Sequence, residues 1–209
     1  MAGTAPASPE YARFVTRERG AQRFPDTVEP LPGGTVLERL VIPRDDVRRL
    51  AVEAAKRASG FFRPTKRTEV VWVNGDSQLA VGLTGVATET GLGHIVVTIP
   101  VRCDQTGPTE VHVTFAVGHP QSPAGLYAAT QRRPRGPAVI VDTWGEAIVA
   151  FAWHVVLDLV TGLAGATGKD TRGNRLVPAE LEATANGLAI VPMARHRFSG
   201  STGITGKIA

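Results

Sequence analysis

The sequence contains little cysteine, methionine or aromatic residue. Its 209 residues include one cysteine, two methionines and 6% aromatics. The single cysteine, Cys103, excludes an internal disulfide bond and any metal site that needs several cysteines. Because aromatic side chains are scarce, we expect a core built mainly from valine, leucine, isoleucine and alanine. With 43% hydrophobic and 20% charged residues, the composition is that of a folded globular protein.

Signals for export and for membrane insertion are also missing. The first residues, MAGTAPASPEYARF, lack the apolar segment of a secretory signal peptide. The longest apolar stretch, 142–165, contains Glu146, His154 and Asp158, and charges near a bilayer centre cost roughly 2.5–3.5 kcal/mol each. We therefore expect a buried helix, no membrane contact, and a location in the cytoplasm or in a particle assembled there. Only four of the 23 basic residues are lysines, a usage typical of GC-rich bacterial or phage genomes.

Proline and glycine divide the chain into three parts. The first 34 residues hold five prolines and end in Gly33-Gly34, which predicts an extended N-terminal arm over 1–34, with a helical turn near 11–19. Residues 199–209 contain few core-forming side chains and predict a flexible C-terminal tail. The remaining segment, 35–198, is long enough for a single domain with one core.

Within this domain, apolar periodicity predicts two helices. The first covers 45–59, with Asp45 as its N-cap and Gly60 at its end. The second covers 143–164 and begins with a capping box formed by Thr143 and Glu146.

The rest of the domain is expected to be mostly β-structure. Two runs on either side of Asn74-Gly75 predict a hairpin with a type I′ turn. Residues 94–103 and 110–118 alternate apolar and polar side chains, so each strand has one buried and one open face. Pro100 predicts a sheet edge or a bulge, because proline cannot donate a hydrogen bond to a neighbouring strand.

Less regular segments complete the predicted order of elements. Short strands are expected over 35–43 and 138–141, and a short helix followed by a last strand within 175–198. The glycine-rich stretches GLTGVATETGLG and GATGKDTRGN lack the context of phosphate-binding loops and are interpreted as turns. The predicted fold is a two-layer α+β domain, an antiparallel meander of about four to six strands with two helices on one face and extended arms at both ends.

His154 and Asp158 are the candidates for a catalytic site. They are four residues apart on a predicted helix and therefore share a face. An aspartate that orients a histidine is half of a nucleophile-activating arrangement. The chain has no G-x-S-x-G motif, and Cys103 falls on the apolar face of its strand. We interpret the pair as polar groups satisfied within a buried helix, and enzymatic activity is not favoured.

His94 and His112 are the candidates for a metal site. Both fall on the open face of the predicted sheet, with Glu110 nearby, and two histidines and a carboxylate can hold a transition metal. No His-x-His or H-E-x-x-H spacing supports this. We interpret them as surface residues, and no metal or other cofactor is expected.

Basic residues gather in two clusters that suit an anionic partner. The net charge is +4. An acidic protein surface or nucleic acid would fit such clusters, although the cluster at 132–136 carries no interleaved aromatic residues for base stacking. The candidate binding residues are Arg63, Lys66 and Arg67 in one cluster and Arg132, Arg133 and Arg135 in the other.

The open sheet face supplies the favoured function. It is predicted to carry mostly small residues of low charge, which is a property of interface cores. Together with the arms, which would become ordered on binding a neighbour, this predicts a non-enzymatic structural or interaction protein. Its expected partners are other protein subunits, in a homo-oligomer or a larger assembly of virion-like or secretion type.

Two other functions remain open. The order of strand, helix, antiparallel strands and long C-terminal helix resembles the START-like helix-grip arrangement. That resemblance implies a cup for an apolar small molecule, bound or converted there, with His154 and Asp158 lining the cavity. The third possibility is non-specific binding of nucleic acid through the arginine clusters, with a steep dependence on salt.

Overall fold

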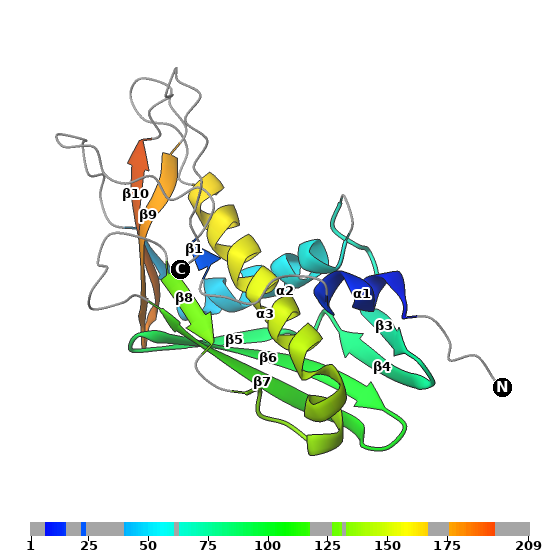
Figure 1. Ribbon diagram of the computed structural model, residues 1–209. Coiled ribbons are helices and arrows are strands. Elements are labelled where there is room, and N and C mark those ends of the chain that lie inside the picture. The colour runs from blue at the N-terminus through cyan, green and yellow to red at the C-terminus, as the bar shows by residue number, and fades with distance from the viewer. Residues whose placement is uncertain are drawn as a thin grey trace.

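The computed structural model describes residues 7–15, 22–23, 40–60, 63–117, 127–130, 133–166 and 176–194. Its helices are α1 (Pro9–Val15), α2 (Arg44–Ser59) and α3 (Ala138–Ala166). The strands are β1 (Gln22–Arg23), β2 (Leu40–Pro43), β3 (Glu69–Asn74), β4 (Ser77–Gly82), β5 (Ala87–Gly91), β6 (His94–Cys103), β7 (Gly107–Val117), β8 (Tyr127–Thr130), β9 (Leu176–Thr184) and β10 (Gly187–Ala194). The fold is α+β, as predicted, with helices packed on antiparallel sheets (Figure 1).

The larger sheet has the order β1-β8-β7-β6-β4-β3, and β5 pairs with β6 in line with β4. β5 lies within a glycine-rich stretch that was predicted as a turn, so that prediction was wrong. The β3–β4 hairpin is present, but Asn74 pairs with Ser77, which places Gly75 and Asp76 in the turn. Among the described residues only glycines have positive φ, and Gly75 is at φ 59°. The geometry is therefore that of a turn with glycine in its first central position, not type I′.

Pro100 lies where the neighbouring strand is interrupted. β4 pairs with Val101 and Arg102, whereas β5 pairs with residues 94–98. Between β4 and β5 the chain bends away, and Gly85 packs against the Pro100 ring. The expected sheet edge or bulge was wrong, because β6 is an inner strand whose register with β7 is unbroken. The residue without an N–H group instead occupies a position of β6 that pairs with no residue of β4 or β5.

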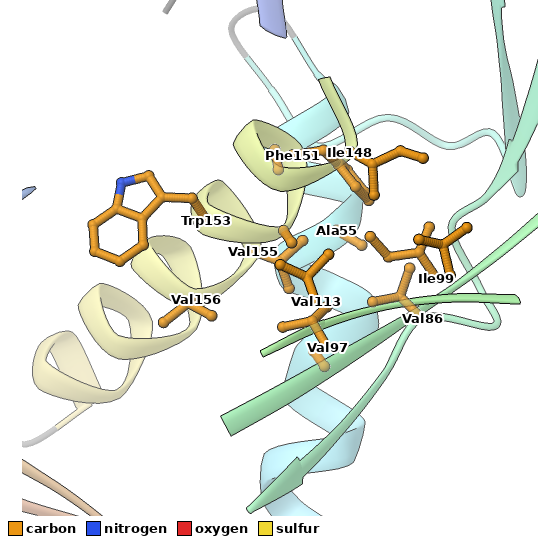
Figure 2. Close-up of a cluster of buried hydrophobic side chains, with 14 of the residues drawn as sticks. Ala55, Val86, Val97, Ile99, Val113, Ile148, Phe151, Trp153, Val155 and Val156 are labelled. Atoms are coloured by element: carbon orange, nitrogen blue, oxygen red, sulfur yellow. The ribbon is translucent and has the colours of Figure 1, made fainter. Parts of the chain in front are cut away.

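Two layers meet at the inner face of the sheet. α2 and α3 both cover this face (Figure 1), and every second residue is buried from Ile95 to Val101 in β6 and from Val111 to Val117 in β7. Figure 2 shows side chains of the sheet, including Ile99 and Val113, pointing toward those of α3, including Ile148 and Val155. All four are 0% exposed, so the meander and its helical cover form one apolar core.

α3 begins earlier than the sequence predicted. Residues 138–141 are its first turn and not a strand; the N–H groups of Ile140 and Val141 both bond to the carbonyl of Pro137. These two side chains are buried, which outweighs the β-propensity of a short Val-Ile-Val run. Thr143 is an exposed residue inside the helix, so the capping box was wrong. The Asp45 cap of α2 was also wrong, because the helix begins after Pro43 without a side-chain cap.

A second, three-stranded sheet has the order β2-β10-β9. Within 175–198 the expected short helix was wrong, whereas the expected last strand is present as β10: residues 176–194 form the β9–β10 hairpin, with Thr184 opposite Gly187. β2 pairs with the other edge of β10. Gly187 has a φ of 141°, and a Cβ there would collide with the Ile42 carbonyl, so only glycine fits.

The segment predicted as the N-terminal arm contributes α1 to the core. Tyr11 and Phe14 are 9% and 2% exposed, and their rings contact Trp72, Trp144 and Phe151. Residues 199–209, the predicted tail, lie outside the described residues.

Candidate interaction surface

The outer face of the larger sheet, called the open face below, lies opposite α2 and α3, so no described helix covers it (Figure 1). Its central residues are outward-facing ones of β6 and β7 that are half-buried by their neighbours, whereas His94, Arg102 and Glu110 on the same face are exposed. The alternation predicted from the sequence is thus observed. The uncharged side chains of this centre are Val96, Thr98, Pro100, Thr114 and Ala116.

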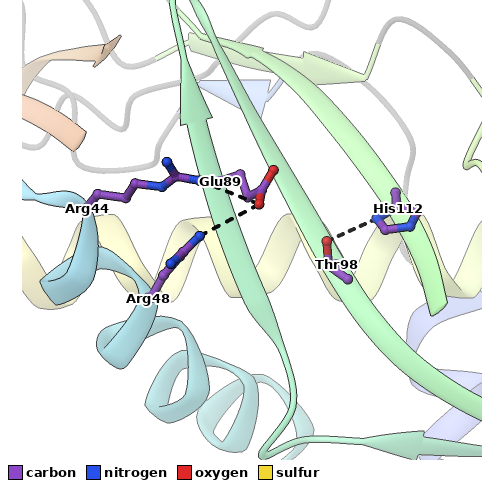
Figure 3. A network of polar contacts seen from close by, with 5 residues as sticks. All are labelled: Arg44, Arg48, Glu89, Thr98 and His112. Carbon is purple, nitrogen blue, oxygen red and sulfur yellow. Dashed lines mark hydrogen bonds and ion pairs between the residues drawn. The ribbon is translucent and has the colours of Figure 1, made fainter. Parts of the chain in front are cut away.

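A hydrogen bond crosses the middle of the open face. Thr98 and His112 lie directly opposite each other on β6 and β7, and the Thr98 hydroxyl is 3.0 Å from Nδ1 of His112 (Figure 3). This contact uses the Thr98 hydroxyl and one ring nitrogen of His112, and it holds the imidazole against the sheet. Together with its small neighbours, this leaves a flat and nearly uncharged centre.

Most charged residues of the open face stand at its rim and are paired, whereas the exposed Glu110, opposite Pro100, has no ion pair among the described residues. Arg102 and Glu69 are 3.2 Å apart on one side. On another side Glu89 of β5 lies 3.5 Å from Arg44 and 3.7 Å from Arg48 of α2 (Figure 3). Exposed ion pairs of this kind add little stability. They leave the rim with both signs of charge in close proximity.

The Glu89 network was not predicted from the sequence. β5 was interpreted as a turn, although the Thr-Glu-Thr order would have indicated an outward glutamate between two inward threonines. The pairing itself depends on the start of α2 lying beside β5, which no local pattern contains.

His94 and His112 do not form a site together. Their strands pair as expected, but His94 lies opposite Ala116, four residues from His112, a distance of roughly 13 Å along the strand. His94 is exposed and its Nδ1 is 3.1 Å from the Leu92 carbonyl oxygen. Within the described residues no cluster of three metal-ligating side chains occurs.

His154 and Asp158 lie where three helices meet, and both are half-buried. The His154 ring is 6.2 Å from that of Phe14 on α1. Arg57 of α2 donates a hydrogen bond to the main-chain carbonyl of Asp158 at 3.4 Å. These contacts join α3 to α1 and α2.

Among the described residues, neither the Cys103 thiol nor the Ser59 hydroxyl is hydrogen-bonded to His154. Cys103 is half-buried, and its Sγ lies 3.3 Å from Oγ1 of Thr106, in the turn that follows β6. This hydrogen bond lowers the pKa of the thiol below its ordinary value. Ser59 Oγ is buried and has no hydrogen-bond partner, so the imidazole does not activate it.

The described part of the cluster at 132–135 includes Arg135, which bridges to His112 of β7. Arg135 exchanges two backbone hydrogen bonds with His112, at 2.8 and 2.9 Å. Arg133 forms an ion pair with Asp142 in the first turns of α3, so part of the positive charge is neutralised internally. Arg132 lies outside the described residues.

The cluster at 63–67 is different, because Arg63, Lys66 and Arg67 are all exposed. They lie on the loop between α2 and β3. The backbone of this loop is tied to the end of α2 by a 3.0 Å hydrogen bond from the Thr65 N–H to the Lys56 carbonyl. All three cations thus lie at the surface of the protein.

In a helix-grip arrangement the ligand would lie between the sheet and the long helix. Among the described residues, side chains of the large sheet and of α3 occupy this space. Rings of the sheet and of α3 contact directly: the centroids of Phe115 and Trp153 are 5.7 Å apart, and those of Trp72 and Phe151 are 6.0 Å apart. Figure 2 shows the same region filled by aliphatic side chains of both layers.

α3 contains a span, residues 138–159, that is long and apolar enough to cross a membrane. However, 61% of its most apolar window is buried inside the protein. The apolar character of this helix is therefore accounted for largely by its contacts with the sheet and with α1 and α2.

Comparison with known proteins identifies no family. No family model matches the chain, and neither does a curated protein or a solved structure. The helix-grip resemblance of the predicted element order consequently stays a prediction.

Proposed function

We propose that the protein is a non-enzymatic structural subunit that assembles with further copies of itself through the open face. The observation that carries this proposal is the distribution of charge on that face. The side chains at its centre are small and mostly uncharged, and apart from Glu110 beside Pro100 its charged residues are paired at the rim. This matches the anatomy of protein interfaces, which have a core depleted in charge and a polar rim.

The size of the open face supports a stable contact. β6 is ten residues long, and ten residues at about 3.3 Å each, across four strands at about 4.8 Å, give roughly 600 Å². A standard interface buries about 800 Å² per partner. The adjoining Val71, on β3, is 44% exposed and adds apolar area at the edge of this surface.

The balance of charge at the rim favours a second copy as the partner. A strongly charged partner would require one sign to dominate, but here Glu69 pairs with Arg102, and Glu89 pairs with Arg44 and Arg48. A surface with both signs can be complementary to itself across a two-fold axis, the commonest symmetry of oligomers.

The test is the molar mass of the purified protein, measured by sedimentation over a range of concentrations. We expect the wild type to form an oligomer. Thr114→Lys, which places a charge at the centre of the open face, should weaken association about tenfold or more, because burying an unpaired charge is costly. The matched control is Thr143→Lys, at an exposed position of α3, which should associate like the wild type.

Two results would overturn the proposal. One is a wild type that remains monomeric at high concentration. The other is equal association of Thr114→Lys and the wild type, which would place any interface elsewhere. Circular dichroism of both variants verifies that they are folded.

A further inference from the structure

His112 is an ionisable side chain at the middle of the open face. It is half-buried, and Thr98 lies directly opposite it on β6. The residues of β6 on either side of Thr98 that share this face are Val96 and Pro100, so its neighbours on this strand are uncharged. Histidine is the side chain whose charge ordinarily changes between about pH 8 and pH 5. The charge at the centre of this surface therefore depends on the protonation of the His112 ring.

Two permanent charges of opposite sign flank this ring. Glu110 lies two residues before His112 on β7 and so points to the same face. On the other side of β7, Arg135 is opposite His112 in an isolated antiparallel bridge, and opposite residues share a face. Both flanking side chains are exposed. Because their charges cancel, this group of three is neutral when the ring is neutral and carries one net positive charge when the ring is protonated.

The hydrogen bond with Thr98 suits both charge states of the ring. Thr98 Oγ1 and Nδ1 of His112 are 3.0 Å apart (Figure 3). A hydroxyl can donate to the unprotonated nitrogen of a neutral imidazole, and it can accept from the N–H group of a protonated one. The same contact therefore holds the charged ring against the sheet, and the charge stays at the centre of the open face.

A positive charge at this position opposes contact between two open faces. When the faces meet, the ring loses water, and burying a charge without a partner is costly. In a two-fold assembly both copies contribute this charge, so the cost occurs twice, and like charges across an interface add repulsion. The rim carboxylates Glu69 and Glu89 do not offset it, because each already has an arginine partner.

Two other histidines lie in the part of the chain that the structure describes, and both are away from this centre. His94 is on the open face, but it is exposed and stands at the start of β6, four residues from the position opposite His112. His154 lies on α3, which covers the inner face of the sheet (Figure 1). A charge on either of them leaves the centre of the open face unchanged.

We propose that His112 is a pH switch of self-association: the neutral ring permits contact between two open faces, and protonation of the ring separates them. This inference rests on the assembly proposed above, whose interface it regulates. Between about pH 8 and about pH 5.5 the dissociation constant should rise about tenfold or more. Aspartate and glutamate ordinarily stay ionised over this range, so the ion pairs of the rim persist.

The experiment measures sedimentation of the full chain at about pH 8 and about pH 5.5, at constant ionic strength. The wild type should dissociate at the lower pH. His112→Gln cannot gain a proton, although its amide can still form a hydrogen bond with Thr98; its dissociation constant should be the same at both pH values. The matched control, His94→Gln, should keep the pH dependence of the wild type. Circular dichroism at both pH values verifies that each protein is folded.

Three outcomes would overturn the switch while leaving the assembly intact. The wild type could associate at the lower pH as tightly as at the higher pH, or more tightly. His112→Gln could keep the pH dependence of the wild type, or His94→Gln could lose it, and either result would assign the effect to another group. A wild type that is monomeric at both pH values would instead overturn the assembly itself, and the switch with it.

Discussion

Replacing Thr88 and Thr90 with valine should stabilise the protein. Both side chains lie on β5 and face the core, 1% and 8% exposed, and neither hydroxyl has a hydrogen-bond partner. A buried donor that has lost water without gaining a partner costs about 1–3 kcal/mol. Valine has nearly the same shape as threonine, so the substitution removes the unsatisfied hydroxyl without opening a cavity.

The expected gain follows from these costs. Taking the lower end, each substitution should raise the free energy of unfolding by about 1 kcal/mol, and the double variant by about 2 kcal/mol. For a chain of this size, 1 kcal/mol corresponds to about 2–4 °C in Tm, so the double variant should melt about 4–8 °C higher. Urea unfolding and calorimetry measure both quantities.

A third threonine provides the control. Thr98 lies on the open face, and its hydroxyl is hydrogen-bonded to His112 at 3.0 Å. Thr98→Val should therefore lower stability by about 0.5–1.5 kcal/mol. If Thr88→Val and Thr90→Val also lower it, their hydroxyls are satisfied in the folded protein, and the inner face of β5 is not the dry surface described above.

Two further predictions concern titration. Burial raises the pKa of Tyr11 above its ordinary value, so the folded state favours the neutral phenol; stability should fall as pH rises past about 10, and Tyr11→Phe should remove that loss in urea unfolding. The hydrogen bond with Thr106 lowers the pKa of the Cys103 thiol. Alkylation of Cys103 should therefore reach half its maximal rate at a lower pH than for an ordinary thiol, and Thr106→Val should raise that midpoint.

Each titration has an outcome that contradicts it. An alkaline loss of stability that persists unchanged in Tyr11→Phe would assign it to other groups. An alkylation midpoint that is the same with and without the Thr106 hydroxyl would show that this hydrogen bond does not stabilise the thiolate of Cys103.

Local pattern predicted the faces of the sheet well. In β6 and β7 the side chains alternate because an extended backbone turns successive residues to opposite sides, whatever lies beside the strand. Residue type predicted the wrong element where a segment can form either a strand or a helix. The run Ala138–Val141 suits a strand by residue type, yet Ile140 and Val141 are buried as the first turn of α3.

The second sheet shows the same limit. The segment Pro178–Ala183 contains good helix formers, but it pairs with β10, which in turn pairs with β2. β2 comes from a distant part of the sequence, and its pairing with β10 extends the β9–β10 hairpin to a three-stranded sheet. Long-range pairing of this kind overrides local propensity.

For the candidate sites, the sequence was sufficient to predict a nearly uncharged open face and the presence of cation clusters. It did not distinguish the two clusters. Arg133 forms an ion pair with Asp142. No ion pair with a carboxylate occurs among the described residues for the other cluster, Arg63, Lys66 and Arg67. Likewise, both histidines were placed on the correct face, but the register that holds His94 four residues from His112 was not predictable.

The sequence by itself determined which side of each strand is apolar and where charge is concentrated, because both are properties of neighbouring residues on a backbone of known period. Only the tertiary structure decided which strands pair, in which register, and which charges find a partner. Those outcomes depend on burial and hydrogen bonding between segments far apart in the chain, and a local pattern contains no information about such distances.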